Sequence, residues 1–197
     1  MPYPTTATPT GLIPVNLIGG QVFASATRQI PLATNSSTAI FFGDVVKLNS
    51  SGVLDKDTGT NSATPVGVFL GCSYTDPVYG KTFRQFYPGT TNITDVVAYV
   101  QDDPDALFKV AVVSSGTTIS YVARTAVGEN AVLVQNSGST ANGDSRVAIS
   151  STTATTSTWP IRIIDVVPET VSAIGSFTEV IVKWNQGMHQ YLNPTGV

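Results

Sequence analysis

Residues able to perform nucleophilic or acid–base chemistry are few and scattered in this chain of 197 residues. The sequence has one cysteine, Cys72, and one histidine, His189, and no G-x-S-x-G motif that would present a serine nucleophile. An enzyme needs a nucleophile, a base or a metal ion placed together. We therefore predict no catalytic residues. We expect Cys72 to be a small buried apolar residue and His189 to be exposed or at an interface.

Three aspartates close in sequence form the best candidate for a metal site. Asp102, Asp103 and Asp105 offer hard oxygen ligands, which suit calcium. The spacing D-D-P-D fits no EF-hand loop, however, and Pro104 stiffens the segment, which favours a solvated turn. Cation binding at this turn is left open. Paired carboxylates for glycoside hydrolysis are also left open, because such pairing is spatial and no pair stands out. No phosphate-binding glycine loop occurs. Apart from the open question at this turn, we predict no cofactor and no metal-binding residues.

Aromatic residues concentrate in the stretch Gly67–Thr91, GVFLGCSYTDPVYGKTFRQFYPGTT. Aromatic rings and arginine beside turns are typical of protein–protein hot spots. The same rings could instead cap one end of the chain's own barrel, and the sequence leaves both possibilities open. The candidate interface residues are Tyr74, Tyr79, Phe83, Arg84, Phe86 and Tyr87.

The elements that must position these residues are strands. Short runs rich in Val, Ile, Thr and aromatic residues alternate with turns rich in Gly, Asn, Asp and Pro, and no window has clean helical periodicity. In FTEVIVKW, for example, Val180, Val182 and Trp184 share one face of a strand. The fold class predicted is all-β, a compact β-barrel or sandwich of roughly ten short strands with extended N- and C-terminal arms.

Three segments are expected along the chain. Residues 1–20 are rich in proline and should form an extended arm, of which residues 1–18 pack on a neighbouring subunit rather than on their own barrel. Residues 21–185 form the β-barrel or sandwich domain. Residues 186–197, which contain Pro194, form an extended C-terminal tail. Ordering two arms costs conformational entropy, which indicates assembly with other subunits.

Charge and hydropathy limit the partners. Charged residues make up 12% of the chain and the formal net charge is −3, so we predict no direct nucleic-acid binding. No apolar run reaches the length of a membrane-spanning helix, and the N-terminus lacks the pattern of a secretory signal. We expect a protein that is made and kept in a cytoplasm, or carried out of it inside or upon something else, with no membrane partner.

The chain resembles small structural proteins of tailed bacteriophages, common in marine phages. The similarity rests on the order of ATRQIPLATNSSTAIFFGDVVKL, TPVGVFLGCSYTDPVYGKTFRQFYPGTT, DVVAYVQDDPDALFKV and EVIVKWNQGMHQY, and spans about Gly20 to Tyr191. The module GDVVKL…GVLDK…PVGVFLG also resembles phage head decoration, or cement, proteins, in which a G-D-x-V hairpin is followed by a G-V strand in a compact barrel.

This resemblance implies a structural virion protein at the capsid surface rather than an enzyme. Its expected partners are the major capsid protein and further copies of itself, as a homo-trimer or homo-dimer. It would stabilise the lattice by bridging capsid subunits, and many copies acting together need only modest interfaces. The alternatives are a tail, collar or head-fibre component, or a carbohydrate-binding β-module whose aromatic residues stack on sugars.

Overall fold

The computed structural model describes residues 8–23, 27–33, 36–90 and 92–197, and within them the fold is nearly all-β. The predicted fold class is confirmed. Helical structure in the described part is limited to the 3₁₀ turns η1 (Arg124–Ala126) and η2 (Pro168–Thr170). Sixteen strands are described rather than about ten, because residues 118–123 and 176–184 each contain two short strands and further strands, such as Ile13–Leu17 and Arg28–Pro31, lie where none was predicted.

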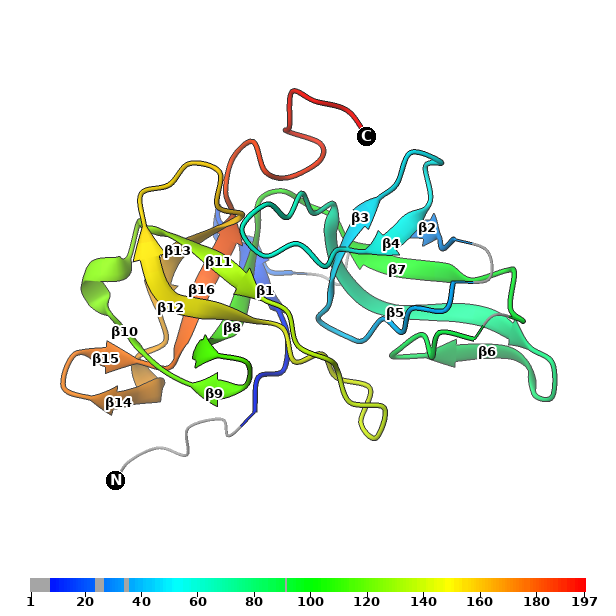
Figure 1. The fold of residues 1–197 in the computed structure, drawn as a ribbon, viewed down its shortest axis with the longest axis horizontal. Coiled ribbons are helices and arrows are strands. Elements are labelled where there is room, and N and C mark those ends of the chain that lie inside the picture. The colour runs from blue at the N-terminus through cyan, green and yellow to red at the C-terminus, as the bar shows by residue number, and fades with distance from the viewer. Residues whose placement is uncertain (1–7, 24–26, 34–35, 91) are drawn as a thin grey trace.

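The first sheet closes on itself. Its strands are β1 (Ile13–Leu17), β8 (Ala106–Ser115), β9 (Thr118–Ile119), β11 (Asn130–Val134), β12 (Ala148–Ala154), β13 (Ile161–Val166) and β16 (Glu179–Trp184). The order is β1-β8-β12-β11-β13-β16, and a further pairing of β8 with β16 joins five of these strands into a barrel. A small sheet of β10 (Val122–Ala123), β15 (Ser176–Phe177) and β14 (Val171–Ala173) lies at the far end of this lobe (Figure 1).

The second sheet forms the other lobe (Figure 1). Its strands are β2 (Arg28–Pro31), β3 (Val45–Leu48), β4 (Leu54–Lys56), β5 (Gly67–Asp76), β6 (Gly80–Arg84) and β7 (Val97–Gln101). The order is β2-β7-β5-β3-β4, with β6 paired to β5. A parallel bridge between Leu32 and Leu54 joins the end of β2 to β4, so this sheet also curls toward closure.

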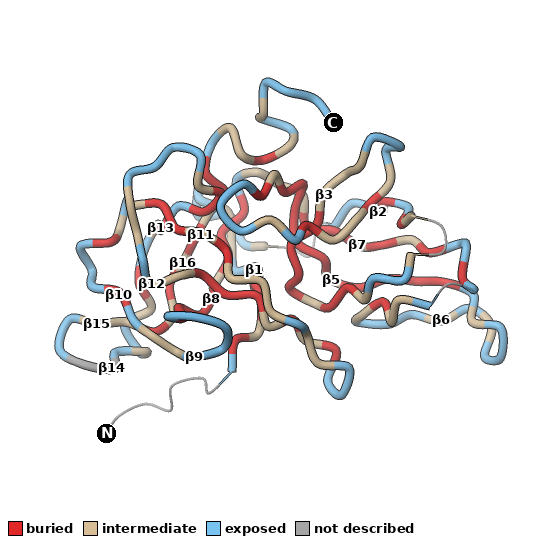
Figure 2. Tube along the Cα trace, in the orientation of Figure 1, coloured by how far each residue is buried: buried red, intermediate tan, exposed pale blue. Residues whose placement is uncertain are grey.

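Two apolar cores fill the fold, and buried segments run along the central strands of both lobes (Figure 2). The first core centres on the first lobe and also includes Val45 and Val68 of the second sheet. The first core contains Phe108 and Trp184, whose rings lie 5.4 Å apart. In β16 the predicted alternation is confirmed, since Val180, Val182 and Trp184 point inward. The second core includes Cys72, which is buried as predicted. Burial raises the pKa of the Cys72 thiol to about 12, so the thiolate is scarcely populated at neutral pH.

The lobes are joined around a buried carboxylate, that of Asp44. Its Oδ2 lies 2.6 Å from the Lys56 ammonium and accepts the Phe41 N–H at 2.9 Å. Its Oδ1 accepts the hydroxyl of Ser145, from the loop between β11 and β12, at 2.6 Å. Asp44 and Ser145 have no exposed surface, so the hydrogen bond between the two lobes is sheltered from water.

Backbone contacts close this junction further. Leu12 N–H donates to the Gly43 carbonyl at 3.0 Å, and Phe42 N–H donates to Gly143 at 3.0 Å. Gly11 has a φ of 78°, and a Cβ there would lie 2.7 Å from both the Gly43 oxygen and the Ser145 Cβ. Only glycine allows this approach without displacing the neighbouring backbone.

The prediction that residues 1–18 pack on a neighbour is wrong for the part that is described. Strand β1 pairs with β8 of its own barrel, from Ile13 opposite Lys109 to Leu17 opposite Ala106. Leu12 is fully buried in the first core. Pro14 is tolerated because β1 lies at the margin of the sheet, where proline's missing donor costs little. Residues 1–7 lie outside the described residues.

The C-terminal tail also packs on its own chain, contrary to a free extended arm. The Gln190 side chain imitates a strand partner: its Oε1 accepts the Leu48 N–H at 2.7 Å and its Nε2 donates to the Leu48 carbonyl at 3.0 Å. The Tyr191 hydroxyl donates to Asp102 at 2.8 Å, and the Arg28 guanidinium lies over the Tyr191 ring. These contacts fasten the tail to the second lobe.

His189 is buried beneath this tail. Of the two expected environments, exposed or at an interface, the exposed one is therefore wrong. It has no accessible surface and contacts the Tyr191 ring edge-on, with 5.2 Å between centroids. Its Nδ1 accepts the Tyr191 N–H at 3.3 Å. Burial lowers the pKa of His189, and this effect outweighs the nearby Val66 backbone and Asp102, which favour the charged form. The folded protein therefore holds a neutral imidazole.

Replacing Asp44 with Asn should lower the free energy of unfolding by about 3 kcal/mol, because the Lys56 ammonium, only 11% exposed, would lose its counter-charge. Chemical denaturation at pH 7 measures the change. Lys47→Met on β3 is the control, since Lys47 has no ion pair among the described residues, and it should cost less than about 0.5 kcal/mol. Equal losses in both variants would contradict a special role for the carboxylate.

Acidification should destabilise the fold through His189. Above the usual pKa of 6.5 neither the folded nor the unfolded state protonates the ring. Below it the unfolded chain takes up a proton that the folded chain resists, so stability falls as pH falls, by at most about 1.4 kcal/mol per pH unit. Denaturation curves between about pH 7.5 and 5 should show a steeper loss for the wild type than for His189→Gln, which lacks this titration. If the stability of the wild type and of His189→Gln fell equally with pH, the folded protein would accept the proton on the buried ring, which contradicts a lowered pKa.

Candidate functional site

The hairpin of β5 and β6 projects from the second lobe because β5 is longer than its neighbours. Pairing with β7 ends at Ser73 opposite Val97, whereas pairing with β6 continues to Asp76 opposite Gly80. The distal part is therefore a two-stranded ribbon at the margin of the lobe (Figure 1). It contains most of the aromatic stretch that the sequence singled out.

The turn of this hairpin is held by Asp76. Its Oδ1 accepts the N–H groups of Val78 at 2.9 Å and Tyr79 at 3.1 Å. These two hydrogen bonds lower the pKa of Asp76, so the carboxylate stays charged near neutral pH. Gly80 follows with a φ of 75°, a conformation that glycine adopts readily. The turn thus presents Val78 and Tyr79 on an ordered backbone.

Asp95 braces the hairpin from the side of β7. Its two oxygens accept the Thr75 hydroxyl at 2.6 Å and the Thr75 N–H at 3.0 Å, and both hydrogen bonds lower the pKa of Asp95. The Lys81 ammonium lies 3.8 Å away, with both side chains about half exposed, so this ion pair adds little.

Two of the six predicted interface residues belong to the core instead. Tyr74 is 1% exposed and Tyr87 is fully buried, and their rings meet edge-on at 6.3 Å. The Tyr87 hydroxyl lies 2.9 Å from the Ser36 carbonyl and 2.8 Å from that of Thr90. Burial raises the pKa of both tyrosines. For this pair the capping alternative is the correct one, and an interface role is wrong.

The other predicted residues lie outside the core. Tyr79 is 78% and Phe83 70% exposed, and Arg84 is exposed as well. Phe86 is half-buried and stacks on Phe41 with 5.6 Å between ring centroids, so it supports the fold. The structure adds a residue that the sequence reasoning missed, Val78, which is 80% exposed beside Tyr79. Its place after Pro77 in a turn was the available signal. We call Val78, Tyr79, Phe83 and Arg84 the hairpin surface.

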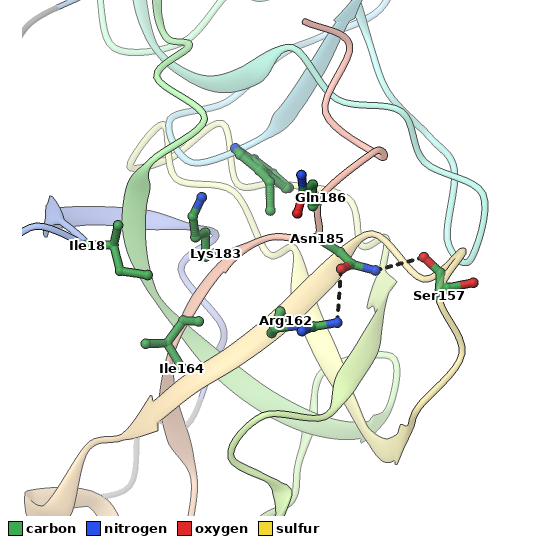
Figure 3. A pocket seen from close by; sticks show the side chains of 8 residues that line it. Ile18, Ser157, Arg162, Ile164, Lys183, Asn185 and Gln186 are labelled. Atoms are coloured by element: carbon green, nitrogen blue, oxygen red, sulfur yellow. Dashed lines mark hydrogen bonds between the residues drawn. The ribbon is translucent and has the colours of Figure 1, made fainter. Parts of the chain in front are cut away.

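A cleft of about 450 Å³ lies on the outside of the barrel along β13 and β16 (Figure 3). Arg162 Nη2 donates to the Asn185 Oδ1 at 3.3 Å, and the Asn185 Nδ2 donates to the Ser157 carbonyl at 2.8 Å. Lys183 is held by the Asp105 carboxylate and the Pro104 carbonyl, both at 2.8 Å. No carboxylate or imidazole lines this cleft. Its polar groups brace the loop that precedes β13, and they offer no acid–base pair.

The aspartate turn is occupied by the chain's own cations. Asp102 pairs with Arg28 at 2.6 Å and Asp105 with Lys183 at 2.8 Å. Asp103 accepts the Asp105 N–H, also at 2.8 Å. Across the residues that the structure describes, no group of three or more His, Cys, Asp or Glu side chains could hold a metal ion. The turn therefore fastens β2 and β16 rather than presenting a ready set of ligands.

No family model, curated protein or solved structure matches this chain. In the described part, no helix is long and apolar enough to cross a membrane. Among the described residues, the hairpin surface places three large apolar side chains, each at least 70% exposed, on one ribbon.

Alanine substitutions should separate the base of the hairpin from its exposed part. Tyr74→Ala should lower the free energy of unfolding by about 3–5 kcal/mol, because it leaves a cavity in the second core. Tyr79→Ala should change it by less than about 0.5 kcal/mol. Phe86→Ala should fall between them, since it loses the stack on Phe41. Equilibrium denaturation gives all three values, and a large loss for Tyr79→Ala would show that its ring packs within the fold.

Proposed function

We propose that this protein is a structural virion protein that binds the outside of a bacteriophage capsid and bridges major capsid subunits. The observation that carries the proposal is the hairpin surface: three large apolar side chains and an arginine, 70% exposed or more for the apolar ones, on a ribbon braced by Asp76 and Asp95. Large exposed apolar side chains on one ordered ribbon favour a binding site. The sequence resemblance to decoration proteins supplies the class of partner.

The scaffold suits such a role. Two curled sheets joined at a buried hydrogen-bonded carboxylate give a stiff body, and a preorganised surface loses little entropy on binding. The few charges leave little to desolvate at a large interface. In the described part, Cys72 and His189 are both buried, and neither is placed to act as an exposed nucleophile or base.

A carbohydrate-binding module is the second candidate, because Tyr79 and Phe83 are exposed aromatic rings on one ribbon. Rings of this kind can stack on the apolar faces of sugars. A tail, collar or head-fibre component would use the same surface against a different virion protein. Copy number per particle separates these from decoration: a value near that of the major capsid protein supports decoration, and a handful supports the other positions.

Binding to capsids lacking the protein should depend on Tyr79. Tyr79→Ala should weaken co-sedimentation with such particles by about 1–3 kcal/mol, or roughly five- to 150-fold in Kd. Tyr121→Ala is the matched control, since Tyr121 is 55% exposed on the other lobe and should leave binding unchanged.

Equal binding by wild type and Tyr79→Ala would contradict the role of the hairpin surface. Absence of particle binding, together with glycan binding that Tyr79→Ala abolishes, would replace the proposal with the carbohydrate-binding one.

A further inference from the structure

Strand β6 leaves one of its edges open. Over the described residues β6 pairs with β5 alone, and no further strand lies beyond it at the margin of the second lobe (Figure 1). An open edge presents backbone donors and acceptors in the spacing that another strand requires.

The register of the hairpin and the contact of Thr75 show which residues of β6 present backbone groups at the open edge. Thr75 N–H donates to Asp95, on the side away from β6, so Thr75 and its partner Lys81 form a non-hydrogen-bonded pair. Both groups of Lys81 therefore point away from β5, to the open edge. Because the pattern repeats every second residue, Phe83 presents its N–H and C=O on the same edge.

We propose that β6 pairs antiparallel with β6 of a second copy, across a twofold axis at Thr82. In this register Lys81 of each copy forms a hydrogen-bonded pair with Phe83 of the other, giving four N–H···O bonds from the outward groups. Gly80 lies opposite Arg84, and Thr82 lies opposite Thr82. The pairing goes beyond the proposed function and does not require it, since the dimer forms without a capsid.

Side-chain complementarity selects this register. Lys81 and Phe83 share one face of β6, so each ammonium lies beside an exposed aromatic ring of the other copy, which favours a cation–π contact. An axis at Lys81 would place two ammonium groups opposite each other, which is unfavourable. An axis at Phe83 would need Gln85 as a pairing residue, and β6 ends at Arg84. Only the Thr82 axis uses the whole strand without opposing like charges.

Cysteine cross-linking tests the register directly. Thr82 and its symmetry mate form a non-hydrogen-bonded pair, whose Cα atoms lie about 4.5 Å apart, within reach of a disulfide. Thr82→Cys should therefore give a covalent dimer under mild oxidation, seen by non-reducing electrophoresis. Arg84→Cys in a Cys72→Ser background is the matched control on the same strand, because Cys72 lies opposite position 84 on β5. In the proposed register the two sulfurs at position 84 are separated by four residues, roughly 13 Å along the strand. The buried Cys72 should not react.

A pair of charge variants tests the noncovalent dimer. Sedimentation velocity of the full chain at rising concentration should show a reversible monomer–dimer equilibrium with Kd in roughly the micromolar to millimolar range. In the dimer of Phe83→Lys, the new lysine of each copy lies opposite Lys81 of the other copy, and these two like-charge pairs should raise Kd at least about tenfold. Phe83→Glu instead creates two opposite-charge pairs and should keep Kd within about threefold. Both variants remove the same ring, so only the sign of charge differs.

Each of the three measurements has a result that would contradict the β6 pairing. A wild type that stays monomeric up to about 1 mM, equal cross-linking at positions 82 and 84, or equal weakening by Phe83→Lys and Phe83→Glu would each overturn the pairing. Because no capsid is present, failure here leaves the Tyr79 binding test unaffected, and a failed capsid test leaves the dimer standing.

Discussion

The arrangement of the two lobes depends on the buried carboxylate of Asp44. A charge with no access to water is costly unless it is paired and hydrogen-bonded. Here Lys56 supplies the counter-charge, and the Phe41 N–H and the Ser145 hydroxyl satisfy the remaining oxygen lone pairs. Since Ser145 belongs to the first lobe and Lys56 to the second, the carboxylate is satisfied only when both lobes are in place. Gly11 lets the N-terminal segment cross the same point closely enough to exclude water.

This fixed junction leaves the remaining freedom to the periphery. Strand β5 runs from the second core out into the ribbon, so a single strand connects the buried Tyr74 with the exposed turn at Tyr79. The ribbon is anchored by the hydrogen bonds of Asp95 to Thr75 and, just after β6, by the stack of Phe86 on Phe41. A surface held in this way can bind another protein without first becoming ordered, which is an advantage for a component of a large assembly.

Both ends of the described chain add to the same body. Strand β1 extends the first sheet beside β8, and the tail fastens to the second lobe through Gln190 and Tyr191. The tail follows β16 of the first lobe, so it spans the two lobes on the side opposite the hairpin (Figure 1). The ring of His189 lies buried beneath this tail, and its burial lowers the pKa of the imidazole.

The sequence by itself determined the all-β class, the buried state of Cys72 and the inward face of β16, because strand alternation and residue hydropathy are local properties. It could not divide the aromatic stretch correctly, since alternation shows which residues share a face but not which face meets the core. That choice was made by the length of β5 relative to β7 and by the packing of Tyr87 against Tyr74. His189 was misjudged because a short polar tail reads as exposed, and only the packing of this tail against the second lobe buries the ring.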